Sequence, residues 1–291
     1  MEARPLRTPI APVFVDGPDG LAIATWDMGG EGPDLLIVHA TGFHSLAYWG
    51  LADELTHRYH VTGVDLRGHG LTAAPPLSRA ADGGFPMLAW ERLGTDVLAV
   101  IDALGLDHPV GFGHSCGGTT LMLAEAERPG TFSAIHAFEP VAFNLEARPA
   151  DTKRGLAAGA LRRRARFVSL DAAFDNYRSK PPLSVLRPDI LWDYVEGGFA
   201  TDDDGAAVLR CAPEVESATF EMAQRSTIWD RLGDVHCPVR VTCGGPTGQF
   251  RLPIAEAVAS RLADGSAHEL PHLSHFGPFE HPEDIAVTIK G

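Results

Sequence analysis

The chain contains Gly113-His114-Ser115-Cys116-Gly117, a G-x-S-x-G sequence typical of a nucleophile elbow. The apolar residues 109–112 before it favour a buried strand, and residues 118–126 after it favour a helix. A serine hydroxyl becomes a useful nucleophile only when a tight turn presents it and a neighbouring base takes its proton. The two glycines leave room where the strand and the helix crowd together. We therefore predict that Ser115 is a catalytic nucleophile.

Composition and charge narrow the classes of partner. The chain has 291 residues, of which 45% are hydrophobic and 21% charged, as in an ordinary soluble globular protein. Its net charge of −14 repels the phosphates of nucleic acids and disfavours an anionic membrane. We expect a small-molecule substrate, with neither nucleic acid nor a membrane as partner, while the oligomeric state stays open.

Targeting and cysteine patterns point to a cytoplasmic protein. No apolar run approaches the roughly 18 residues that span a bilayer, and the first residues lack the apolar segment of a secretory signal. The four cysteines are scattered without C-x-x-C spacing, which argues against a disulfide framework and against a zinc site. We expect no metal and no cofactor.

Strand and helix patterns alternate along most of the chain. Apolar strand-like runs and helical runs follow one another at 21–26, 35–39, 47–55, 61–65, 90–104 and 134–138. This alternation predicts an α/β fold, a mostly parallel sheet covered by helices on both faces. The alternation resumes with strands at 239–242 and 267–270 and helices at 253–263 and from 282.

The segment between these two parts has a different pattern. Residues 141–232 show no clear strand and contain helical stretches and many aromatics, so we predict a largely helical insertion. The predicted domains are a core of residues 1–140 and 233–291 and an inserted cap of residues 141–232. The run Arg162-Arg163-Arg164 within the insertion is interpreted as a solvated helix face.

A base must lie near the serine in space. His275 is the best candidate, because it follows the last predicted strand, and active sites of open α/β sheets lie beyond the strand ends. His268, His272 and His281 flank it in the sequence and are weaker candidates.

Four stretches together resemble the α/β-hydrolase fold superfamily over nearly the whole chain. They are residues 35–42 (LLIVHATG), 65–70 (DLRGHG), 113–117 (GHSCG) and 275–282 (HFGPFEHP). The resemblance implies an eight-stranded, mostly parallel sheet with an inserted helical cap over the site. It also implies Ser115 as nucleophile and His275 as base.

The chain departs from the family pattern at the third member of the triad. The acid usually follows the strand that corresponds to residues 239–243, but here residues 244–249 read GGPTGQ and hold no carboxylate. Glu139, at the end of the strand after the elbow helix, is the natural substitute, as in some relatives that place the acid there. It could instead be a helix cap or a salt-bridge partner. Glu280 is a rival that resembles a structural acid of the family.

The resemblance also implies an oxyanion hole of two backbone amides. One belongs to Cys116, the residue after the nucleophile. The other falls on Thr41, since His39-Ala40 stands where the family usually has His-Gly. His44, Phe43 and Phe276 are candidates for contact with the substrate.

The favoured function is a cofactor-free serine hydrolase of the esterase or lactonase kind, which cleaves a small, apolar ester or lactone through an acyl-enzyme. A C–C bond hydrolase on the same fold is the sibling alternative. A non-catalytic ligand receptor with this fold, and a cofactor-free oxygenase or perhydrolase, are alternatives from other classes.

Overall fold

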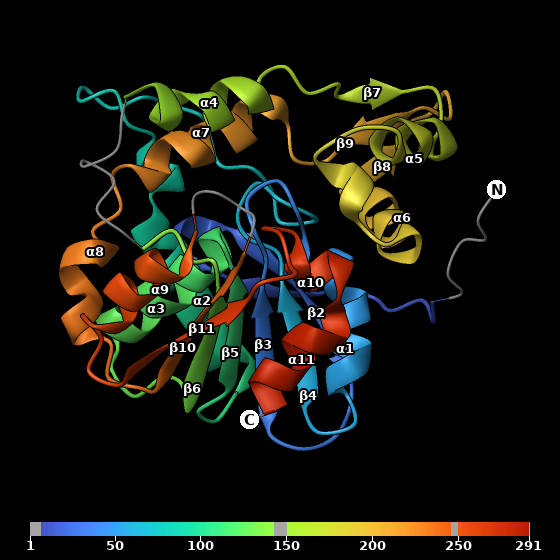
Figure 1. Ribbon diagram of the computed structural model, residues 1–291. Coiled ribbons are helices and arrows are strands. Elements are labelled where there is room, and N and C mark those ends of the chain that lie inside the picture. Colours follow the sequence, from blue (N-terminus) through green and yellow to red (C-terminus); the bar gives the residue numbers. More distant parts are fainter. Residues whose placement is uncertain (1–6, 143–149, 246–249, 291) are drawn as a thin grey trace.

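A computed structural model describes residues 7–142, 150–245 and 250–290 and contains a central eight-stranded sheet (Figure 1). The strand order is β1-β2-β4-β3-β5-β6-β10-β11. The pairs β1–β2 and β2–β4 are antiparallel, and all the others are parallel. The strands are β1 (Val13–Asp16), β2 (Ala22–Gly29), β3 (Asp34–Val38), β4 (His60–Val64), β5 (Val110–His114), β6 (Ala134–Phe138), β10 (Val239–Gly244) and β11 (Gly265–Leu270). The predicted fold class is confirmed.

Helices cover both faces of this sheet. Helices α1 (Trp49–Leu55) and α11 (Pro282–Lys290) pack on one face, and α2 (Trp90–Leu104) and α3 (Cys116–Glu127) pack on the other (Figure 1). The remaining core helices are α9 (Leu252–Ala259) and the short α10 (Gly277–Glu280).

Strand β3 shows why the sequence is apolar without alternation. Leu36 and Val38 belong to the core cluster under α2 and α3, whereas Leu35 and Ile37 belong to the cluster under α1 and α11. Successive side chains of a strand point to opposite faces, so a strand buried on both faces needs apolar residues at every position.

The edge strand β1 was not anticipated. Most of its side chains are exposed to solvent: Phe14 is 54% exposed, and of the four residues only Val15 is buried. A short strand with one buried side chain carries little of the periodic signal on which sequence interpretation depends.

The inserted cap lies over one end of the sheet (Figure 1). Its helices are α4 (Ala150–Ala160), α5 (Leu170–Arg178), α6 (Pro188–Gly198) and α7 (Pro213–Ala223). Helix α8 (Ile228–Arg231), near the end of the predicted insertion, lies instead beside α3 of the core (Figure 1). The sequence shows no clear strand in this largely helical insertion, but β7 (Arg166–Phe167), β9 (Ala207–Leu209) and β8 (Phe199–Thr201) form a small antiparallel sheet within it. Strands of two or three residues are too short to show alternation.

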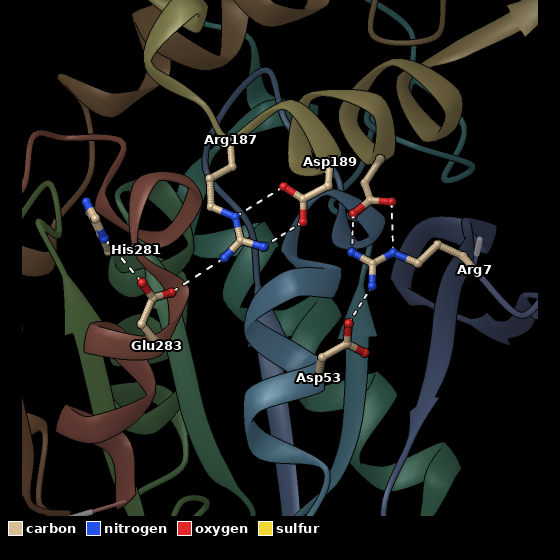
Figure 2. A network of polar contacts seen from close by, with 7 residues as sticks. Arg7, Asp53, Arg187, Asp189, His281 and Glu283 are labelled. Carbon is tan, nitrogen blue, oxygen red and sulfur yellow. Dashed lines mark hydrogen bonds and ion pairs between the residues drawn. The ribbon is translucent and has the colours of Figure 1, made fainter. Parts of the chain in front are cut away.

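Ion pairs join cap helix α6 to the core along one side (Figure 2). The Arg7 guanidinium donates to Asp193 of α6 over 3.1 and 2.7 Å and to Asp53 of α1. Arg187, just before α6, lies 3.5 Å from Glu283 of α11. Of the residues in these ion pairs, Asp193 is the one that is buried, with 3% side-chain exposure. Its pairing with Arg7 therefore contributes more to stability than the exposed ion pairs do.

Within the described ranges, no helix is both long enough and apolar enough to cross a membrane.

Candidate active site

Ser115 occupies a sharp turn between β5 and α3. Its φ of 53° is positive, a conformation that costs a non-glycine residue on the order of 1–3 kcal/mol. The Ser115 amide donates to Phe138 O over 2.8 Å, which ties the turn to β6. A Cβ at Gly113 would lie 2.5 Å from Gly118 Cα, and one at Gly117 would lie 2.0 Å from Val38 O. The turn therefore requires both glycines of the motif.

The structure brings His275 and Glu139 together. His275 Nδ1 lies 2.6 Å from Glu139 Oε2, across 136 residues of sequence. Glu139 follows β6 with a φ of 46°, and it is 1% exposed. Its other carboxylate oxygen accepts from the Gly244 amide over 2.8 Å. Because the carboxylate accepts a hydrogen bond from Nδ1–H, the neutral imidazole carries no proton on Nε2, which can therefore act as a base.

The loop after β10, which lacks an acid, holds this carboxylate through its backbone. A Cβ at Gly244 would lie 2.2 Å from Leu273 O, and one at Gly245 would lie 2.3 Å from Pro271 O. The Gly245 amide also donates to Leu273 O over 3.1 Å. The two glycines thus let this loop pack directly on the loop that carries His275. Residues 246–249, the rest of the loop predicted to lack an acid, lie outside the described residues.

Glu280 lies close in sequence to His275 but supports its loop in another way. Its Oε2 accepts from the Ser274 amide over 2.8 Å. The Ser274 hydroxyl in turn accepts from the Phe276 amide over 3.1 Å. Glu280 therefore supports the backbone just before His275, and Ser274 supports the backbone just after it, whereas Glu139 is the carboxylate bonded to the imidazole.

Three rings surround the His275 imidazole. Phe250 stacks on it with ring centroids 5.2 Å apart and an interplanar angle of 16°. Phe276 meets it edge-on at 5.7 Å, and His114 lies 4.8 Å away. Sequence reasoning missed Phe250 and His114 as neighbours of the base, since no local pattern marks a ring that stacks across two loops.

The loop expected to supply an oxyanion donor follows β3 and comprises residues 39–44; it is called the oxyanion loop below. The Ala40 amide donates to the Tyr48 hydroxyl over 3.0 Å, and the Ala40 carbonyl accepts from the Phe43 amide over 3.1 Å. The Thr41 amide finds no acceptor within the described part of the chain. Cys116 is the first residue of α3, so its amide has no intrahelical partner. Both amides expected in the hole are thus free to donate, and their role stays a prediction.

Buried neutral histidines shape this loop. His39 Nε2 accepts from the Leu66 amide over 2.9 Å, so Nδ1 carries the proton that it donates to Ala40 O over 2.8 Å. Burial lowers the pKa of His39 to about 3. Burial and the adjacent His275 likewise lower the pKa of His114 well below its usual value. Both rings serve as neutral hydrogen-bonding groups at physiological pH.

The three residues predicted to contact substrate lie around the same loop. Phe43 stacks on Phe279 at 4.6 Å, and its ring lies 6.2 Å from that of Phe276. His44 is buried, and its Nε2–H donates to Tyr194 O of α6 over 3.0 Å. His44 thereby joins the loop to the cap. Contact of these side chains with a substrate stays a prediction.

A polar cluster in the cap rests on the oxyanion loop. Arg163 bonds to Glu216 of α7 and to the Tyr194 hydroxyl, and Tyr194 donates to Gly42 O over 3.3 Å. A Cβ at Gly42, whose φ is +80°, would lie 2.5 Å from Glu216 Oε1. The interpretation of the arginine run as a solvated face is therefore wrong for Arg163, whose side chain is 17% exposed. Tertiary pairing with Glu216, which sequence periodicity cannot show, draws it inward.

The part of the chain that the structure describes holds no group of His, Cys, Asp or Glu side chains arranged for a metal ion. Its four cysteines are free and buried.

Comparison with known proteins agrees with the fold. The model of the Alpha/beta hydrolase family matches residues 35–288. The 2-(acetamidomethylene)succinate hydrolase of Mesorhizobium japonicum is 27% identical over 267 residues, 90% of this chain and 87% of that protein. The pimeloyl-(acyl-carrier protein) methyl ester esterase of Methylococcus capsulatus is 32% identical over 117 residues, 40% of this chain and 39% of that protein. A crystal structure of E-2-(acetamidomethylene)succinate hydrolase has a TM-score of 0.79 at 20% identity and covers 97% of this chain and 98% of its own.

Proposed function

The chain belongs to the alpha/beta hydrolase family, and on that premise we propose that it is a cofactor-free serine hydrolase that cleaves a small, apolar ester or lactone. Ser115 attacks the carbonyl carbon while His275 Nε2 takes its proton. The imidazolium then gives that proton to the leaving oxygen, and an acyl-enzyme forms. Water, activated by the same imidazole, releases the acid.

The observation that carries this proposal is the pairing of His275 Nδ1 with Glu139 Oε2 over 2.6 Å. A buried carboxylate in this position holds the imidazole in the tautomer that can accept a proton from serine, and it stabilises the imidazolium that forms. The Gly244 amide fixes the second carboxylate oxygen, so the orientation does not depend on the imidazole alone.

Two further observations support the apolar ester class. Aromatic rings of Phe250 and Phe276 flank His275, and apolar walls favour substrates that bury hydrocarbon surface. One relative is an esterase that acts on a methyl ester, as its name states.

The test is steady-state hydrolysis of p-nitrophenyl acetate and butyrate by the wild-type chain and by Ser115→Ala. We expect sustained turnover that the alanine variant loses. A single burst without turnover would favour the ligand receptor, and wild-type turnover matched by Ser115→Ala would refute the assignment of the nucleophile. Cleavage of vinylogous 1,5-diketones in preference to esters would favour the C–C hydrolase.

A further inference from the structure

We propose that the side-chain hydroxyl of Thr41 is a third donor to the oxyanion, beside the backbone amides of Thr41 and Cys116. The inference rests on the proposed function. It assigns the Thr41 side chain, and not only its backbone, to contact with the reacting atoms.

The Thr41 hydroxyl is buried without a partner. Thr41 is 7% exposed, and its Oγ1 has no hydrogen-bond partner within residues 7–142, 150–245 and 250–290. Leaving a buried hydroxyl unpaired costs on the order of 1–3 kcal/mol, and the large majority of buried polar side-chain atoms are paired for that reason. An atom of a bound substrate would satisfy this donor.

The neighbouring carbonyls of the loop are already occupied. Ala40 O accepts from the Phe43 amide and from His39 Nδ1. Gly42 O accepts from the Tyr194 hydroxyl. Ala40 O thus already accepts two hydrogen bonds, and in the described residues the Thr41 hydroxyl bonds to neither of these flanking carbonyls.

The register of the sheet places this hydroxyl beside the elbow. Val38 of β3 pairs with Gly113 of β5, so Thr41 and Cys116 each lie three residues beyond a paired position. A Cβ at Gly117 would lie 2.8 Å from His39 O, which shows how closely the start of α3 abuts the end of β3. Burial raises the pKa of the Cys116 thiol to about 12, and the Thr41 side chain is close enough to act on this pKa in the opposite direction. The hydroxyl thus lies next to the residue whose amide is the other expected donor.

The chemistry requires a donor in this place. When Ser115 Oγ bonds to the carbonyl carbon, the π electrons of the C=O bond move onto its oxygen, and the serine proton moves to His275. The Thr41 O–H stabilises the resulting negative charge by a hydrogen bond and keeps its proton. As the tetrahedral intermediate collapses, the C=O bond re-forms, the bond to the leaving oxygen breaks and His275 protonates that oxygen. Donors placed for this intermediate stabilise charge that is absent from the ground state.

The experiment compares Thr41→Val with Thr41→Ser on p-nitrophenyl butyrate. Valine keeps the shape and the backbone amide but removes the hydroxyl, and we expect kcat to fall about 10- to 100-fold, because two backbone donors remain. We expect KM to stay within about twofold, since the contact strengthens only in the transition state. The serine variant keeps the donor and should retain kcat within about threefold.

Two measurements separate this role from a structural one. A trifluoromethyl ketone, which forms a tetrahedral oxyanion on serine, should bind Thr41→Val more weakly by the factor lost in kcat. The thermal unfolding temperature of Thr41→Val should equal or exceed that of the wild type, because an unpaired buried hydroxyl has been removed. The inference would be overturned if Thr41→Val kept kcat within twofold of the wild type. It would also be overturned if Thr41→Ser were as slow as Thr41→Val and both variants unfolded at a lower temperature than the wild type. Absence of wild-type ester hydrolysis would instead overturn the proposed function, and this inference with it.

Discussion

Replacing Glu139 by glutamine tests the centre of the site with little change in shape. The glutamine carbonyl oxygen can still accept from the Gly244 amide, which now bonds to Glu139 Oε1 over 2.8 Å. The glutamine NH₂ would then face His275 Nδ1, in place of the carboxylate oxygen that lies 2.6 Å away. Two donors cannot face each other, so the imidazole proton would move to Nε2. Ser115 would then meet a donor where it needs an acceptor.

The expected loss in kcat is about 10³–10⁴, the effect that removal of a triad carboxylate has elsewhere. At about 1.36 kcal/mol per tenfold change, this corresponds to roughly 4–5 kcal/mol of transition-state stabilisation. The loss combines the wrong tautomer with the missing negative charge beside the imidazolium. The assay is steady-state hydrolysis of p-nitrophenyl butyrate, with thermal unfolding measured in parallel to show that the variant is folded.

Glu280→Gln is the matched control, because Glu280 lies five residues after His275 but its carboxylate bonds to the backbone and not to the imidazole. Its carboxylate accepts from the Ser274 amide over 2.8 Å, and a glutamine carbonyl oxygen can accept the same bond. We expect kcat within about threefold of the wild type. Near wild-type activity of Glu139→Gln in a folded protein, or an equal loss in both variants, would refute the assignment.

Three further perturbations follow from the same contacts. Tyr48→Phe removes the hydroxyl that accepts from the Ala40 amide over 3.0 Å and bonds His114 Nδ1 over 2.8 Å; we expect urea unfolding to show a loss of about 1–3 kcal/mol, because buried groups lose a partner, and an unchanged midpoint would contradict this. Gly117→Ala would place a Cβ 2.0 Å from Val38 O, so we expect little folded protein by circular dichroism, whereas Gly233→Ala, at a site where an added Cβ meets nothing within 4 Å, should fold. For Asp193, burial raises the pKa to about 6 although the bond to Arg7 opposes the shift. Because the folded protein binds the Asp193 proton more tightly than the unfolded chain does, this proton stabilises the fold. The stabilisation is complete below the pKa of the unfolded chain, 3.8, and is lost as the pH rises through about 6. The stability of the wild type relative to Asp193→Asn should therefore fall between about pH 4 and about pH 7, by on the order of 2–3 kcal/mol; a constant difference in unfolding free energy would argue against it.

The sequence alone determined the elbow and the layered core. The G-x-S-x-G motif is contiguous in the sequence, and Gly113 leaves room for Gly118 of the same strand–turn–helix unit, although Gly117 leaves room for Val38 of β3. Helix α2 (Trp90–Leu104) has the predicted bounds, because one face of it is apolar at helical spacing. Strand β3 was evident because burial on both faces makes the whole run apolar.

Only the tertiary structure decided which polar groups meet. Thr242 of β10 pairs with Phe138 of β6, and this register brings Glu139 to the Gly244 amide and to a histidine 136 residues away. The sequence could nominate Glu139 only because the usual acid position was empty. Arg163 bonds to Glu216 of α7, and Phe250 stacks on His275 although the two residues lie on different loops. Periodicity reports which side of an element is buried, whereas the pairing of polar groups depends on the order and register of strands that are distant in the chain.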